Sequence, residues 1–317
     1  MTAKLRKKQP KALIIGSSGQ DGYYLSELLR GKGYSVTGLD RNNGIDHKVD
    51  ICDRKAMLGY LDKARPDHIY FLAAYHRSTE TESEDLRITL DQSIEVHVKA
   101  LLNVLEGVEC HCPGSRLFYA GSSHVFGEPL AYPQNEQTPF NPDCPYGITK
   151  AMGMNLCRLF RKERRIFASC GILFNHESPR RSPQFISRKI ARGVVDIDRG
   201  RAKKIILGDL SAAVDWGAAE DYVKAMYSIL CLNEPDDFVV ATGKLHTVSQ
   251  FAEIAFKAVG LNSELYLIEK PGLIRKNKRT CPLVGDATKI YKKTGWIPSI
   301  GFEDLVTSMV RAELANG

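Results

Sequence analysis

Short apolar runs alternate with helix-like segments along this chain, and the alternation restricts the fold more than any other feature of the sequence. The apolar runs lie at residues 11–16, 34–40, 68–74, 115–123, 166–174 and 237–243. The segment after the first run places Leu25, Leu28 and Leu29 at helical spacing before Gly31. Such alternation predicts a parallel, doubly wound sheet with helices on both faces, which is an α/β fold of the Rossmann type.

Two of the intervening helices are expected to be long, near residues 91–106 and 146–161. A shorter helix is expected within 51–67. After residue 175 the alternation loosens, and basic residues and prolines become more frequent. The run at 237–243 is expected to return to the sheet.

Composition excludes several classes of protein. The 317 residues carry a net charge of +7 and 43% of them are hydrophobic, which is an ordinary globular balance that suits a phosphate-bearing small ligand. No basic stripe with interleaved aromatic residues indicates nucleic acid, and no apolar run is long enough to cross a bilayer. The eight dispersed cysteines lack metal-ligand spacing, and the N-terminus lacks the pattern of a secretory signal. We therefore expect no metal, no disulfide framework and a cytoplasmic protein.

A glycine motif joins the first predicted strand to the first predicted helix. Gly16, Gly19 and Gly22 form the pattern G-x-x-G-x-x-G. Glycine suits this turn because it is tight and a pyrophosphate has to approach bare backbone, while the helix N-terminus offers amides and the positive end of its dipole. Three glycines in a loop are often turn residues alone, but the position between strand and helix favours a dinucleotide site.

The end of the second predicted strand bears on the choice of dinucleotide. Asp40 stands there, where a carboxylate can hydrogen-bond the adenosine ribose and repel a 2′-phosphate. This favours NAD over NADP. The alternative is that Asp40 is a turn residue and that Arg41 holds the phosphate of NADP.

A tyrosine and a lysine stand four residues apart in the long helix near 146–161. Tyr146 and Lys150 therefore share one helix face, where an ammonium group can lower the pKa of the phenol and make it a base. The pattern is common by chance, and an exposed pair is the alternative. Ser122 favours a catalytic role for the tyrosine and the lysine, because it follows the preceding strand at the edge of the sheet where ligands bind.

Together these residues resemble the extended short-chain dehydrogenase/reductase superfamily, and within it the GDP-mannose 4,6-dehydratase branch. The stretches ALIIGSSGQDGYYLSELL, NEQTPFNPDCPYGITK, GILFNHESPRR and DWGAAEDYV carry the resemblance, which spans about residues 11–312. It implies a Rossmann domain for the dinucleotide, 9–175 with about 215–245. It also implies a smaller nucleotide-sugar domain, 176–214 with 246–317, and oxidation of a GDP-sugar at C4 with bound NAD or NADP.

The resemblance assigns roles to individual residues. Those implied to hold the cofactor are Gly16, Gly19, Gln20, Asp21 and Gly22 at the pyrophosphate, Asp50 and Ile51 at the adenine, Ala73 and Ala74 along the cofactor, and Leu173, His176 and Arg181 at the nicotinamide half. Those implied to act in catalysis are Ser122, Tyr146 and Lys150. Those expected to contact the nucleotide-sugar are Ser123, Asn175, Lys189, Arg275 and Arg279.

Three departures from the branch bear on function. His124 replaces the glutamate that serves the branch as acid/base for dehydration, and Val214 replaces a diphosphate-binding arginine, a role that Arg275 or Arg279 can take over. The loop after Asp40, which reaches a neighbouring subunit in the branch, is shortened. We therefore expect a homodimer rather than a tetramer, joined through a four-helix interface.

A histidine at position 124 is compatible with two kinds of enzyme. An imidazole titrates near neutrality, so His124 can serve as the acid/base of a 4,6-dehydratase, which is the preferred reading. The alternative is a C4-specific dehydrogenase, 4-keto reductase or epimerase that does not dehydrate. A catalytically silent binding protein is disfavoured because Ser122, Tyr146 and Lys150 are all present.

Overall fold

Six parallel strands form the central sheet of the computed structural model, which describes residues 9–40, 49–75, 85–270 and 281–316. The sheet order is β2-β1-β3-β4-β5-β9. The strand bounds are β1 (Lys11–Ile15), β2 (Ser35–Leu39), β3 (His68–Phe71), β4 (Arg116–Ala120), β5 (Phe167–Leu173) and β9 (Asp237–Val240). The predicted parallel sheet is confirmed, including the return of the run at 237–243. Each strand is shorter than its apolar run, and in the first five runs the residues that follow the strand line the cavities at the edge of the sheet.

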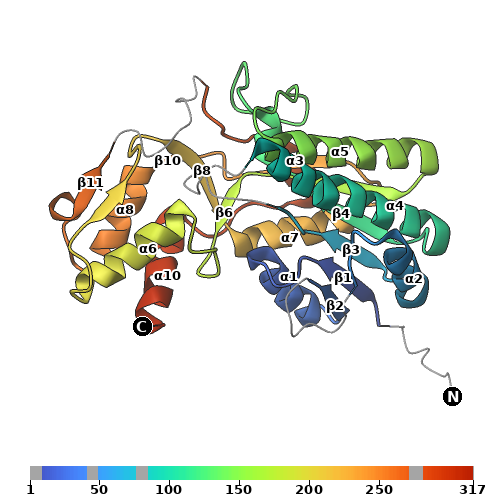
Figure 1. The fold of residues 1–317 in the computed structure, drawn as a ribbon, viewed down its shortest axis with the longest axis horizontal. Helices are drawn as coiled ribbons and strands as arrows, with labels where there is room; N and C mark the ends of the chain where they lie inside the picture. Colours follow the sequence, from blue (N-terminus) through green and yellow to red (C-terminus); the bar gives the residue numbers. More distant parts are fainter. Residues whose placement is uncertain (1–8, 41–48, 76–84, 271–280, 317) are drawn as a thin grey trace.

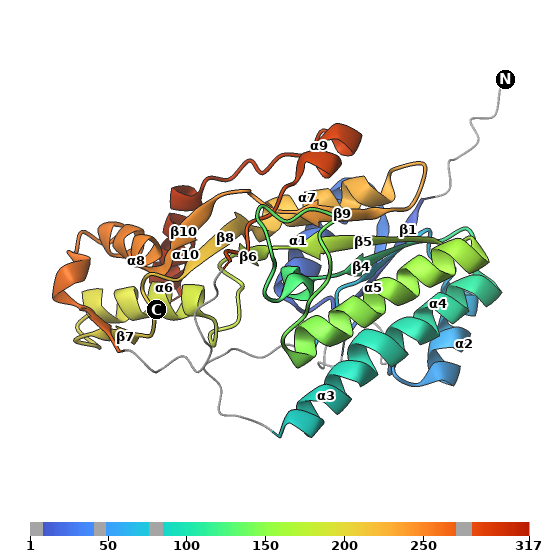
Figure 2. The ribbon, with the colours of Figure 1, turned by 90° about the horizontal axis from the view of Figure 1, so that it is seen from above.

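Helices cover both faces of this sheet (Figure 1). One face packs on α1 (Gln20–Gly31) and α7 (Ala219–Leu230), and the other on α2 (Arg54–Ala64), α4 (Ala100–His111) and α5 (Pro145–Arg164). Alternate residues of β1 enter different cores, since Leu13 packs with the α4 and α5 side and Ile14 packs with the α1 and α7 side. Figure 2 shows the sheet edge-on between these two layers.

The long helix predicted at 91–106 differs from the structure. Its path begins earlier, with α3 (Leu86–Ile94), and continues through a wider π-helical turn, η1 (Glu95–Lys99), into α4. The side chain of Asp85 caps the start by accepting a hydrogen bond from the backbone N–H of Arg87. The wide turn carries His97, which is fully buried. The predicted helix at 146–161 is extended to residues 145–164.

A second group of elements lies beside the main sheet, at the left of Figure 1. It contains a small sheet of order β10-β8-β6 and a strand pair, β11 and β7, with α6 (Ile186–Asp198), α8 (Val248–Lys257) and α10 (Phe302–Ala315). The strand bounds are β6 (Asn175–Glu177), β7 (Ile205–Leu207), β8 (Ala213–Ala218), β10 (Leu245–Thr247) and β11 (Leu267–Glu269). The three helices share a core of their own.

The remaining elements are the short turns η2 (Ser123–Phe126) and η3 (Ser263–Leu265) and the helix α9 (Thr288–Thr294). Ile290 of α9 packs into the core beneath the main sheet. A boundary near residue 215 would cut through β8, so the division into a dinucleotide domain and a sugar domain stays a prediction. Within the described ranges, no helix is long and apolar enough to cross a membrane.

Candidate active site

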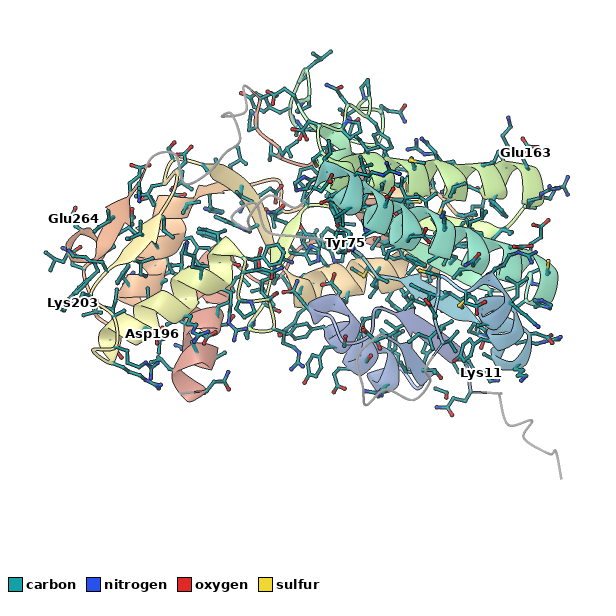
Figure 3. The ribbon with its side chains drawn as sticks, in the orientation of Figure 1. Lys11, Tyr75, Glu163, Asp196, Lys203 and Glu264 are labelled. Carbon is teal, nitrogen blue, oxygen red and sulfur yellow. The ribbon has the colours of Figure 1, made fainter. Side chains whose placement is uncertain are left out.

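Two adjoining cavities open at the carboxyl edge of the main sheet, where a doubly wound fold binds its ligands. The first has a volume of about 830 Å³ and lies over β1, β2 and β3. The second has a volume of about 380 Å³ and lies between β4, α5 and the small sheet. Leu72 and Ala74 line both cavities. Tyr75, which lines the first, lies near the centre of the molecule, where the two groups of elements meet (Figure 3).

The glycine loop gives the first cavity its bare backbone. Gly16 has a φ of +92°, and a Cβ atom there would lie 2.7 Å from the backbone nitrogen of Ala73. A Cβ at Gly22 would lie 2.5 Å from the carbonyl oxygen of Gly16. The Oγ of Ser17 is buried in this loop and has no hydrogen-bond partner among the described residues. A tight backbone cradle with an unsatisfied hydroxyl fits the pyrophosphate of a dinucleotide.

The structure places most of the predicted cofactor residues around this cavity. Those that line it are Gly16, Gly19, Asp40, Asp50, Ile51, Ala73 and Ala74. The carboxylate of Asp40 accepts hydrogen bonds from the backbone N–H and the hydroxyl of Ser18, at 3.0 and 2.5 Å. These bonds fix the carboxylate at the end of β2, beside the loop. Arg41 lies outside the described residues.

Gln20 and Asp21 connect the glycine loop to β6 rather than lining the first cavity. The side-chain amide of Gln20 donates to the carbonyl of His176 at 3.0 Å, and its oxygen accepts from the hydroxyl of Ser178 at 2.8 Å. The carboxylate of Asp21 lies 2.9 Å from Nε2 of His176. The predicted pyrophosphate residues therefore have two different roles. The glycines allow the close backbone packing of the loop, and the side chains of Gln20 and Asp21 hold the loop against β6.

The ion pair of Asp21 and His176 is partly buried, with 20% of the Asp21 side chain and 12% of the His176 side chain exposed. Both ring nitrogens of His176 face acceptors, because Nδ1 lies 2.8 Å from the carbonyl oxygen of Phe174. Burial opposes the charge on each partner, yet their mutual attraction lowers the pKa of Asp21, with help from Arg181, and raises the pKa of His176. The imidazolium stacks on Tyr222, with ring centres 4.5 Å apart.

Ser122, Tyr146 and Lys150 meet in the second cavity, as predicted. The side chains of Ser122 and Tyr146 are hydrogen-bonded to each other. The Nζ atom of Lys150 lies 5.6 Å from the centre of the Tyr146 ring and donates to the carbonyl of Ala120 at 2.7 Å. The spacing of four thus brings both groups to the one face of α5 that faces the cavity.

The expected lowering of the phenol pKa is not found for Tyr146. Burial raises the pKa of Tyr146 to about 12, although Arg181 and the bond to Ser122 act in the opposite direction. Burial also lowers the pKa of Lys150 to about 7. The prediction considered only the helix spacing, whereas desolvation of both groups dominates in the folded chain.

His97 is a residue of the site that the sequence analysis missed. Its Nε2 accepts a hydrogen bond from the backbone N–H of Tyr75 at 2.9 Å, so Nδ1 carries the proton and donates to Oγ1 of Thr149 at 2.8 Å. Its ring packs edge-on against Tyr146, with centres 5.3 Å apart. His97 thereby connects the first cavity to the catalytic face of α5. The prediction of a regular helix over 91–106 did not indicate that the side chain of His97 is buried.

The residues predicted for the nicotinamide half of the cofactor, Leu173, His176 and Arg181, line the second cavity, together with His124 and Val214. The residues predicted for the nucleotide-sugar are distributed unevenly, and Asn175 lines the same cavity. Ser123 is buried without lining either cavity, and Lys189 is half-buried on α6 without lining them. Arg275 and Arg279 lie outside the described residues. Asp209, which the sequence analysis did not select, also lines this cavity.

His124 stands beside Tyr146, the predicted catalytic tyrosine. Its ring packs edge-on against Tyr146, with centres 5.7 Å apart at 88°. Its Nδ1 lies 3.8 Å from Sγ of Cys144, a contact that the sequence analysis did not anticipate. No group of three or more His, Cys, Asp and Glu side chains within the described ranges is arranged to hold a metal ion.

Sequence comparisons identify relatives of the whole chain. The family model described as GDP-mannose 4,6 dehydratase matches residues 13–309. GDP-mannose 4,6 dehydratase 2 of Arabidopsis thaliana is 38% identical, over 96% of this chain and 86% of its own length. The GDP-mannose 4,6 dehydratase of Homo sapiens is 36% identical, over 98% of this chain and 93% of its own.

Solved structures share the fold at lower sequence identity. RMD from Pseudomonas aeruginosa, complexed with NADPH, has a TM-score of 0.85 and 19% identity, and the match covers 98% of this chain and 100% of that one. The UDP-glucose 4-epimerase of Thermus thermophilus, complexed with NAD, has a TM-score of 0.81 and 20% identity, with 97% and 100% covered. Both are complexes with a nicotinamide dinucleotide.

Substitution His176→Gln tests the ion pair between Asp21 and His176. It removes the positive charge beside a partly buried carboxylate, so we expect a loss of roughly 2 kcal/mol in the free energy of unfolding near pH 6. Folding lowers the pKa of Asp21 and raises that of His176. The contribution of the pair is therefore full between about pH 4 and about pH 6.5, the ordinary values of the two groups. It declines as pH falls through the lowered pKa of Asp21 or rises through the raised pKa of His176.

Urea unfolding of the wild type and of His176→Gln between pH 4 and pH 9 measures this dependence. A stability difference that stays constant across the range would contradict the charged pair.

Proposed function

Because the chain belongs to the GDP-mannose 4,6-dehydratase family, we propose that it oxidises the hexose of a GDP-sugar at C4 with bound NAD(P) and then removes water across C5 and C6. The observation that carries the proposal is the convergence of Ser122, Tyr146 and Lys150 in a cavity that adjoins the dinucleotide cradle. A silent binding protein has no use for all three groups.

The three side chains have distinct tasks in the first step. When bound, the oxidised nicotinamide supplies the hydride acceptor and a positive charge. Tyr146 takes the proton of the C4 hydroxyl on its phenol oxygen, and Ser122 hydrogen-bonds the same substrate oxygen. Lys150, fixed by the carbonyl of Ala120, favours the phenolate when it is protonated.

The dehydration step is assigned to His124. Removing the C5 proton and protonating the leaving C6 hydroxyl needs an acid/base group within the proposed sugar cavity, and the imidazole of His124 lines that cavity. The second candidate is an enzyme that stops at C4, as a dehydrogenase, a 4-keto reductase or an epimerase. It is favoured by the absence of a glutamate at position 124.

Catalysis by Tyr146 is tested with Tyr146→Phe. We expect C4 oxidation of GDP-mannose to fall by about a thousandfold, because the proton acceptor is lost, while the affinity for the cofactor is unchanged. Lys150→Met is expected to lose both activity and cofactor affinity. Near wild-type turnover of Tyr146→Phe, measured by cofactor reduction in a single turnover, would refute the assignment.

Product analysis separates dehydration from C4 chemistry. We expect the wild type to convert GDP-mannose, or a related GDP-sugar, to a product that has lost one water, identified by mass spectrometry. In His124→Ala, dehydration should slow by roughly a hundredfold while C4 oxidation continues. His124→Glu should restore dehydration. A wild-type product with C6 still hydroxylated would establish the C4-specific alternative.

The preferred cofactor in this proposal is NAD. Asp40 is held by Ser18 at the position where a 2′-phosphate of NADP would approach. We expect NAD(H) to bind at least tenfold more tightly than NADP(H), a difference of about 1.4 kcal/mol, in fluorescence titrations. Asp40→Ser should reduce the preference. Tighter binding of NADP(H) by the wild type would transfer the role to Arg41.

We further propose that the protein is a cytoplasmic homodimer. All eight cysteines are free thiols, which suits a reducing compartment. Apolar side chains are exposed along the outer faces of α3, α4 and α5, at Ile88, Leu102, Ile148, Met152 and Leu159. Helical spacing aligns Ile148, Met152 and Leu159 on one stripe of α5, which a second copy can cover by two-fold symmetry.

Light scattering of the wild type should give the mass of a dimer. Met152→Glu places a charge in the stripe and should shift the protein towards monomer. Leu265→Glu, at an exposed position outside the stripe, is the matched control and should leave the mass unchanged. A stable wild-type tetramer would contradict the proposal.

A further inference from the structure

Cys144 lies behind His124 and contacts its imidazole. The sulfur is 3.8 Å from Nδ1, within the range of a hydrogen bond to sulfur. The same sulfur caps α5 by accepting the backbone N–H of Gly147 at 3.5 Å. His124 lines the sugar cavity, whereas Cys144 is not among the residues that line it. The thiol thus supports the acid/base group without facing the substrate.

Close backbone packing holds this contact in place. A Cβ atom at Gly147 would lie 2.4 Å from the carbonyl oxygen of His124, so only a glycine lets η2 approach the start of α5 this closely. The backbone N–H of His124 donates to Oγ of Ser122 at 3.3 Å. Its ring is therefore confined between the sulfur of Cys144 and the edge-on ring of Tyr146.

We propose that Cys144 is a positioning residue that sets the tautomer of His124, its sulfur accepting the Nδ1–H so that Nε2 keeps a lone pair. The sulfur already accepts the backbone N–H of Gly147 at the N-terminus of a 20-residue helix, so it acts as an acceptor at this position. The hydrogen bond at one ring nitrogen determines which nitrogen carries the proton. An imidazole with an unprotonated Nε2 is a base, whereas the other tautomer presents a donor.

The consequence for catalysis rests on the proposed function. The C5 proton passes to Nε2, and its electron pair remains on C5 in conjugation with the C4 ketone. The C5=C6 bond then forms as the C6–O bond breaks, and the proton on Nε2 leaves with the hydroxyl as water. Throughout this cycle the sulfur of Cys144 stabilises the imidazolium through Nδ1–H.

Two substitutions separate positioning from helix capping. Cys144→Ser retains an N-cap, but its shorter side chain withdraws the acceptor from Nδ1. Cys144→Ala removes both functions. Cys110→Ser, at an exposed thiol, is the control. Nitrogen-15 spectra of the labelled full-length protein report the tautomer directly. We expect Nδ1 of His124 to be protonated in the wild type and in the control, and a tautomer mixture in Cys144→Ser. Protonation at Nε2 in the wild type would overturn the proposal without reference to any substrate.

Deuterium uptake at C5 in heavy water tests the catalytic consequence. We expect Cys144→Ser to slow uptake about tenfold relative to C4 oxidation of GDP-mannose, and Cys144→Ala to do the same while also lowering the melting temperature. Wild-type uptake in both variants would overturn the positioning role. If the wild type oxidises no GDP-sugar, the proposed function fails instead, and the nitrogen spectra still decide the tautomer.

Discussion

The partly buried ion pair of Asp21 and His176 links the two halves of the candidate site. Asp21 belongs to the first turn of α1, directly after the glycine loop, and His176 belongs to β6 of the small sheet. Gln20 adds a second bridge to the same strand. Because His176 also stacks on Tyr222 of α7, the charged pair is anchored in the core beneath the main sheet. The glycine loop beside the first cavity is thus joined by polar contacts to the strand that borders the second cavity.

Burial also sets the chemistry on the other side of the cavity. Lys150 is almost completely excluded from solvent, and its ammonium group has one carbonyl partner and two neighbouring aromatic rings. Its lowered pKa of about 7 means that its charge responds to whatever charge enters the cavity. Burial favours the neutral form of Tyr146 as well, and a positive charge in the cavity would lower the pKa of both groups. Both groups are therefore sensitive to the charge of the bound dinucleotide.

Sequence reasoning reached the parts of the fold that depend on local pattern. The strands, the glycine loop and the meeting of Tyr146 with Lys150 follow from periodicity and from the geometry of a parallel sheet. It missed the wide turn at η1, because the residues of this turn follow the same local pattern as a regular helix. The turn becomes evident only in the folded chain, where His97 contacts Thr149. It also missed Cys144, which is 20 residues from His124 in the chain and becomes its neighbour only when η2 packs on α5. The pKa values of Tyr146 and Lys150 depend on how far the whole fold excludes water from them, and the spacing of the two residues does not predict this.

The two cavities share a wall at Leu72 and Ala74, so each can hold its own ligand beside the other. A 4,6-dehydration returns to the sugar the hydride that it removed, so it is redox-neutral over one cycle. An enzyme of this kind can keep one dinucleotide through many turnovers and exchange only nucleotide-sugars through the second cavity. Gln20 and Asp21 hold the glycine loop against β6, so the loop proposed to bind the dinucleotide is fixed in place. Dinucleotide would then be retained as a resident group, and its supply would not limit the flux of sugar.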